Sequence, residues 1–215
     1  MSNPESFIDE VTEEVRRDKL FAAFRKYGWI GGLLVAVVVG GTAWTEWRKS
    51  TEAAAAQAFG DAILTATEAE TPEARRAALA AVPATGEQAA VLNLLLASDP
   101  AENREATLAA LQKVEADTTL PQVWRDLAVL RRVALQGADL SVTERRGLLD
   151  PMAQPGRIFR PLAAELLAYL LVEEGKTPEA ITALQALTKD QEAPSGLRNR
   201  AAQMIVALGG TVDQG

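Results

Sequence analysis

The sequence predicts an all-α protein in which a single transmembrane helix precedes an array of helical hairpins. Three observations support this prediction. The 19 residues between Lys26 and Glu46 carry no charge. Ala, Leu, Glu and Arg, which lose little entropy on entering a helix, dominate the composition, and only 5% of residues are aromatic. Apolar residues follow helical spacing between Pro and Gly breaks, and no stretch alternates with the period of a β-strand.

We divide the chain into three parts. Residues 1–26 are expected to form an amphipathic leader, because apolar residues recur there at helical spacing. Residues 27–47 are expected to form a transmembrane signal-anchor helix, and 48–215 a helical repeat domain beyond the membrane. A leader of 26 residues is too long for a cleaved signal peptide, and no small-residue cleavage site follows the apolar run.

The uncharged run is long enough, at a rise of about 1.5 Å per residue, to cross most of a bilayer core. Tyr27 and Trp29 stand at one end and Trp44 and Trp47 at the other, where aromatic rings settle at membrane interfaces. A buried helix of a soluble protein is the alternative, but such helices seldom lack every charge over this length. We therefore expect a membrane span.

Basic residues predict the orientation of the span. Two of them, Arg48 and Lys49, follow it closely. Five precede it closely: Arg16, Arg17, Lys19, Arg25 and Lys26. Because positive flanks stay in the cytoplasm, the leader is expected there and the helical domain on the opposite side.

Beyond the span, Pro and Gly breaks divide the sequence into short helices. The expected ranges are 51–69, 72–82, 86–98, 102–117, 121–136, 141–152, 159–175, 177–190 and 194–208. Helices of this length, joined by tight breaks, are typical of an array in which no hairpin buries its apolar face alone.

An internal repeat supports the array. At an offset of 73 residues, the matched pairs are Ala110-Leu-Gln with Ala183-Leu-Gln, Asp117 with Asp190, Pro121 with Pro194, Arg125 with Arg198 and Ala128 with Ala201. This offset is about twice a 34-residue helix-turn-helix unit plus a few inserted residues. The matching segments are therefore expected to be alternate repeats.

Large and small residues alternate within each unit as in tetratricopeptide hairpins. In one unit the packing residues are expected to be Leu167 and Ala168 in the first helix and Ala180 and Leu184 in the second, with a turn at Gly175. In the unit that begins near Pro121 they are Trp124, Leu127 and Ala128. A generic helical bundle is the alternative, because 141–152 fits the pattern poorly.

The order of these parts resembles a bacterial inner-membrane family that includes the ancillary subunit of the SecYEG translocon. The resemblance rests on the acidic leader, Leu20-Phe-Ala-Ala-Phe-Arg-Lys-Tyr-Gly-Trp, the span, Trp44-Thr-Glu-Trp and the degenerate hairpins. It implies a periplasmic helical domain. It also implies three kinds of protein partner: the SecYEG translocon, a membrane-anchored periplasmic chaperone of the parvulin type, and secreted chains as they emerge. Leu187, where a small residue is usual, departs from the repeat pattern.

Composition argues against other functions. The chain has no Cys and no His, which removes thiol nucleophiles, imidazole bases and the usual zinc and haem ligands. No phosphate-binding glycine loop or nucleophile elbow is present, so we expect neither catalysis, cofactor, metal nor small-molecule substrate. A net charge of −7 argues against nucleic acid binding.

We expect a non-catalytic, membrane-anchored protein-interaction scaffold. The alternative is a structural subunit that stabilises another inner-membrane complex through its span and leader. In the first case, the tetratricopeptide register places a partner-binding groove on the residues that follow the large and small positions of each first helix. The candidate groove residues are Arg125, Val129, Glu165, Tyr169 and Arg198, with Arg132 one turn beyond Ala128.

Overall fold

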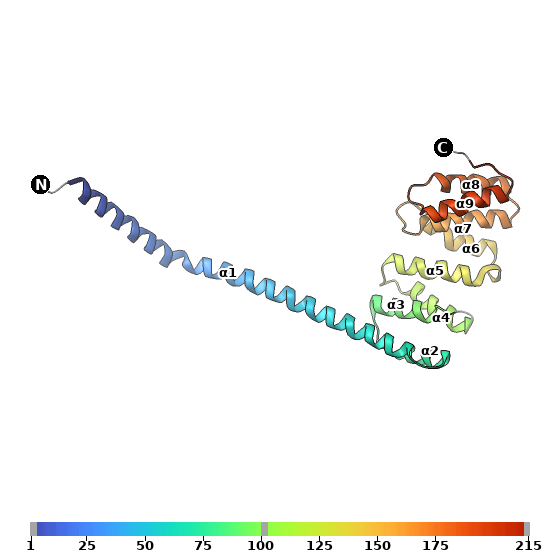
Figure 1. Ribbon diagram of the computed structural model, residues 1–215, viewed down its shortest axis with the longest axis horizontal. Coiled ribbons are helices and arrows are strands. Elements are labelled where there is room, and N and C mark those ends of the chain that lie inside the picture. The colour runs from blue at the N-terminus through green and yellow to red at the C-terminus, as the bar shows by residue number, and fades with distance from the viewer. Residues whose placement is uncertain (1–3, 100–102, 213–215) are drawn as a thin grey trace. The chain divides into compact units, whose positions relative to one another are not determined.

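A computed structural model describes residues 4–99 and 103–212 of the chain, and their side chains from Arg25 onward except for Tyr27. These residues form helices and turns with no strand, which confirms the predicted fold class (Figure 1). Two compact units are present, Met1–Gly60 and Asp61–Gly215. The side chains of residues 1–24 and of Tyr27, on which part of the sequence argument rests, lie outside the described side chains.

Helix α1 (Pro4–Thr67) contains residues 4–26 of the leader, the expected span and residues 51–67 of the helix expected over 51–69 in one continuous element. No Pro occurs between its ends, so nothing in the sequence breaks the backbone hydrogen bonds. Beyond the apolar run, an ion pair of 2.8 Å between Arg48 and Glu52 supports the helix at i, i+4 spacing.

Within α1, the segment Gly28–Thr67 is long and apolar enough to cross a membrane, and its apolar window is not buried at all. Trp29, Trp44 and Trp47 are each at least 60% exposed, although all three are large and mainly apolar. The rings of Trp44 and Trp47 lie 5.4 Å apart between centroids. An unburied apolar helix of this kind is a candidate membrane span.

The second unit is a stack of short helices (Figure 1). They are α2 (Pro72–Ala80), α3 (Gly86–Leu96), α4 (Arg104–Ala116), α5 (Gln122–Gln136), α6 (Val142–Leu149), α7 (Arg160–Glu173), α8 (Thr177–Lys189) and α9 (Ser195–Ala207). Two 3-10 turns, η1 (Gly137–Asp139) and η2 (Asp150–Met152), flank α6. The ends of α2 to α9 agree with the predicted ranges to within three residues.

Local capping explains several helix starts. Thr71 and Asn103 accept hydrogen bonds from the backbone N–H groups of Ala74 and Ala106, at 3.1 and 2.9 Å. Ser141 and Glu144 form a reciprocal capping box at the start of α6. Gly175, which the sequence placed at a turn, has a φ of +73° after α7, a conformation that favours glycine.

Helices α3, α5, α7 and α9, each the first helix of a repeat, share one feature. A Pro at or just before the start of each helix is followed seven residues later by a buried Ala. The pairs are Pro83 and Ala90, Pro121 and Ala128, Pro161 and Ala168, and Pro194 and Ala201. The four alanines are at most 1% exposed. A side chain this small lets neighbouring helices approach closely, so these pairs mark the repeat register in α3, α5, α7 and α9.

The core consists of three successive clusters. The first joins α3, α4 and α5, the second joins α5, α6 and α7, and the third joins α7, α8 and α9. Helices α5 and α7 therefore each serve two clusters. Each hairpin buries its apolar face against its neighbours, which is the arrangement expected of a repeat array.

Helix α6 is short and carries a buried arginine. Arg145, only 9% exposed, donates from both Nη atoms to the carboxylate of Glu173 at the end of α7, at 2.8 and 2.6 Å. Its Nε donates to the carbonyl of Leu140. These bonds hold α6 onto α7 where the hairpin pattern is weakest.

Candidate functional site

The predicted packing residues of the repeats lie in the core. Ala128, Ala168, Ala180 and Leu184 are completely buried. The larger residues Trp124, Leu127 and Leu167 are half-buried and pack against the clusters around them. Buried positions cannot contact a partner, so only the other positions on these helices can do so.

The six candidate groove residues lie on three helices: Arg125, Val129 and Arg132 on α5, Glu165 and Tyr169 on α7, and Arg198 on α9. The structure brings Glu165 and Tyr169 together, because the Tyr169 hydroxyl donates to Glu165 Oε1 at 3.0 Å. Among the described residues, no hydrogen bond joins this α7 pair to the three arginines. The candidate groove is therefore a set of separate contacts and not one hydrogen-bonded network.

Two of the arginines serve the scaffold. Arg132 binds Glu115 of α4 through Nε and Nη2, both at 2.7 Å, and its side chain is only 12% exposed. Arg198 donates to the backbone carbonyls of Asp190 and Ala193 in the loop before α9. These bonds attach α5 to α4 and fix the start of α9.

Arg125 and Val129 make fewer side-chain hydrogen bonds than Arg132 and Arg198. Arg125 Nη2 donates to Gln122 Oε1 at 2.6 Å, while its buried Nε has no hydrogen-bond acceptor in the described part of the chain. Val129 is half-buried and packs against the second core cluster. Arg125 therefore makes fewer hydrogen bonds to other helices than Arg132.

Sequence reasoning missed Arg200, the residue that completes the α7 pair. Its Nε and Nη2 bind Glu165 Oε1 and Oε2 at 3.0 and 2.7 Å. The Glu165 side chain is 3% exposed, whereas that of Arg200 is 53% exposed. A buried carboxylate requires a partner, but the 35 residues between the two gave no local spacing signal.

Burial sets the electrostatics of this cluster. Loss of solvent, together with the hydrogen bond to Glu165, raises the pKa of Tyr169 above its ordinary value of 10.0. The phenol therefore remains a neutral donor at physiological pH. Glu165 accepts three hydrogen bonds from Tyr169 and Arg200 and is balanced in charge by the guanidinium.

Beside Arg200 lies an open apolar depression, which we call the α7–α9 pocket. It has a volume of about 420 Å³. Its walls come from the segment that leads into α7 and from the start of α9. The lining residues are Ile158, Phe159, Pro161, Leu162, Glu192, Pro194, Gly196, Leu197 and Arg200. This size falls in the usual range of roughly 300 to 1,000 Å³ for ligand pockets.

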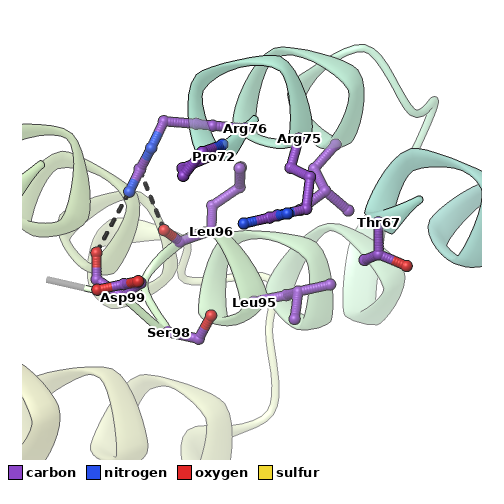
Figure 2. A pocket seen from close by; sticks show the side chains of 9 residues that line it. Thr67, Pro72, Arg75, Arg76, Leu95, Leu96, Ser98 and Asp99 are labelled. Atoms are coloured by element: carbon purple, nitrogen blue, oxygen red, sulfur yellow. Dashed lines mark hydrogen bonds between the residues drawn. The ribbon is translucent and has the colours of Figure 1, made fainter. Parts of the chain in front are cut away.

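A second, smaller pocket of about 200 Å³ lies where the end of α1 meets α2 and α3 (Figure 2). Arg76 reaches across it to the carbonyls of Leu96 and Asp99, at 3.1 and 3.4 Å. From α5, Arg131 donates to two further carbonyls at the same end of α3. Cations at a helix C-terminus stabilise its unpaired carbonyls. The arginines at this pocket therefore stabilise the end of α3.

No group of three His, Cys, Asp or Glu side chains within the described residues has the arrangement of a metal site.

Residues 24–206 match the family model described as a tetratricopeptide repeat-like domain. No curated protein and no solved structure matches the chain. The match covers most of the sequence, including every helix that carries the Pro and Ala repeat. The chain therefore belongs to the tetratricopeptide repeat-like family.

Proposed function

We propose that this protein is a membrane-anchored, non-catalytic scaffold that binds other proteins through its helical array. The proposal rests on one observation: the same chain contains an unburied apolar helix and a tetratricopeptide-like domain. This fold generally serves protein interaction and not catalysis. Anchoring would hold the domain near its partners at high effective concentration, so that weak contacts suffice.

The proposed location is a bacterial inner membrane, with the N-terminus in the cytoplasm and the helical domain in the periplasm. The excess of Lys and Arg before the span supports this orientation. The resemblance to the family of the ancillary translocon subunit supports the partners that we propose. They are the SecYEG translocon, a membrane-anchored periplasmic chaperone and secreted chains as they emerge.

The absence of Cys and His from the sequence supports a function without catalysis. The Glu173 and Glu174 carboxylates, which stand next to each other, bind Arg145 and Arg146 of α6. These carboxylates hold the hairpin together and are not arranged as a general acid and base.

Affinity capture from gently solubilised membranes tests the proposal. Three proteins are compared: the full chain, a variant without residues 61–215, and a variant whose residues 27–47 are replaced by an unrelated span. We expect SecYEG to be recovered with the full chain and the span variant, and lost with the truncated chain. Recovery with the truncated chain alone would instead favour the structural-subunit function.

Protease added to spheroplasts checks the orientation in the same strains. The helical domain should be digested without lysis. Digestion only after lysis would place the domain in the cytoplasm and contradict the proposed location.

A further inference from the structure

We propose that the α7–α9 pocket binds a large apolar side chain presented by an extended, uncharged segment of a partner polypeptide. This inference rests on the proposed protein-binding function and names the surface and the kind of segment that it takes. None of the candidate groove residues lines the pocket, but Arg200, which does, binds Glu165 and so links the pocket to the Glu165 and Tyr169 pair.

Ile158 is the first reason. It is 71% exposed, more than any other large apolar side chain in the described residues. It lies in the wall of the pocket together with the half-buried Phe159 and Leu162. An exposed isoleucine beside an apolar hollow leaves hydrophobic surface in water that an incoming apolar side chain would cover.

The charges at the rim are the second reason, because each is already paired within the protein. Arg200 is paired with the buried Glu165, and Glu192 is paired at 2.6 Å with Arg160, which also binds Asp190. Bringing an acidic residue into this pocket would require its desolvation without a free positive charge to offset it. The pocket therefore selects an uncharged segment over an acidic one.

The backbone at the start of α9 is the third reason. Pro194 occupies the N-cap position, so no side-chain oxygen caps the first turn of the helix. The N–H groups of Ser195 and Gly196 precede any intrahelical acceptor and can donate to carbonyls of an extended chain. A bound segment would thus pair its backbone at the rim while its apolar side chain enters the pocket.

Gly196 provides a sharp steric test. A Cβ built on it meets no other heavy atom within 4 Å, and its backbone is helical. Leucine at this position would occupy space in the pocket without displacing the protein's own atoms. Gly196→Leu should therefore fold normally and obstruct the site.

The experiment uses the full chain in lipid nanodiscs, because detergent would compete for an apolar pocket. The probe is a short fluorescein-labelled peptide of Gly, Ser and Thr with one central Phe, and binding is followed by fluorescence anisotropy. We expect Ile158→Ser and Gly196→Leu each to weaken binding by about tenfold or more. Val206→Ser is the matched control, because Val206 is 63% exposed on α9 and lies outside the pocket.

A second peptide, with Asp in place of the central Phe, should bind the wild-type chain at least about tenfold more weakly. Circular dichroism should show unchanged helicity for all three variants. Equal binding of the Phe peptide by wild type and Gly196→Leu would overturn the pocket assignment, as would tighter binding of the Asp peptide. Recovery of SecYEG by the full chain would still stand in that case, so failure of the pocket and failure of the proposed function are separable.

Discussion

Arg200 of α9 holds the buried Glu165 of α7 through two hydrogen bonds, from Nε to Oε1 at 3.0 Å and from Nη2 to Oε2 at 2.7 Å. The pair joins two first helices of the array across 35 residues of sequence. Glu165 cannot reach water, whereas Arg200 lies half in solvent. Loss of the arginine would therefore leave a buried charge without a partner, whereas loss of the carboxylate would leave a guanidinium that water can still solvate.

Replacement of Arg200 by Ala should lower the free energy of unfolding by about 2 to 3 kcal/mol, because it leaves a buried carboxylate without its cation. This loss is smaller than for a fully buried ion pair, because Arg200 is half exposed to solvent. Urea unfolding followed by circular dichroism measures it. The control is Arg104→Ala, whose ion pair with Asp139 is exposed and should contribute about 1 kcal/mol or less. An equal loss of unfolding free energy in both variants would show that the Glu165–Arg200 pair contributes no more than an exposed ion pair.

Replacement of Ala168 by Leu should destabilise the domain by about 1 to 3 kcal/mol. Ala168 is completely buried where α7 meets its neighbours, so extra methyl groups must displace packed side chains. Ala109→Leu on the exposed face of α4 is the matched control and should have little effect. Thermal melting of the two variants gives the comparison. An unchanged melting temperature for Ala168→Leu would show that the repeat register is wrong.

The sequence predicted the helices well because their ends have local causes: caps such as Ser141, glycine turns such as Gly175 and the prolines at the starts of helices such as α5 and α7. It predicted the small buried alanines because close helix crossings require them. Long-range partners were different. Arg200 pairs with Glu165 and Arg157 with Asp126, over 35 and 31 residues, and neither pair has a spacing rule that a single sequence reveals. The α7–α9 pocket depends on two loops meeting in space, which no local pattern predicts.

Two glycines should respond oppositely to replacement by Ala. A Cβ on Gly210 would lie 2.9 Å from Cγ2 of the buried Ile205 and 3.1 Å from Cδ1 of Ile181, so Gly210→Ala should destabilise by about 1 to 3 kcal/mol. Gly147 lies inside α6 with open space around it, and Gly147→Ala should stabilise by roughly 0.5 to 1 kcal/mol. Chemical unfolding of both variants should show shifts of opposite sign. The same sign for both would contradict the packing described at Gly210.

Stability should fall in acid through Glu173. Its hydrogen bonds from Arg145 lower its pKa below the ordinary value of 4.5. A carboxylate whose pKa is depressed by folding contributes stability that is complete above its unfolded pKa and is lost as the pH falls through its folded pKa. The free energy of unfolding should therefore decline below about pH 4.5, and less steeply in Glu173→Gln. A slope that Glu173→Gln does not alter would contradict the assignment.

The candidate groove arginines should separate into two kinds. Arg125, whose hydrogen bond is to Gln122 on the same helix and whose charge acts on Asp117, is the member that we propose to contact a partner. Arg125→Ser should change stability by less than about 1 kcal/mol, since the hydrogen bond that it removes lies within one helix, and should reduce the recovery of SecYEG in affinity capture. Arg132→Ser and Arg198→Ser should each cost about 1 to 3 kcal/mol, because they leave Glu115 or the carbonyl of the buried Ala193 without a donor. Circular dichroism melting and capture from the same preparations distinguish the two effects. Full recovery by a stable Arg125→Ser variant would remove the α5 face from the binding surface and leave the α7–α9 pocket, the span or the leader as the docking site.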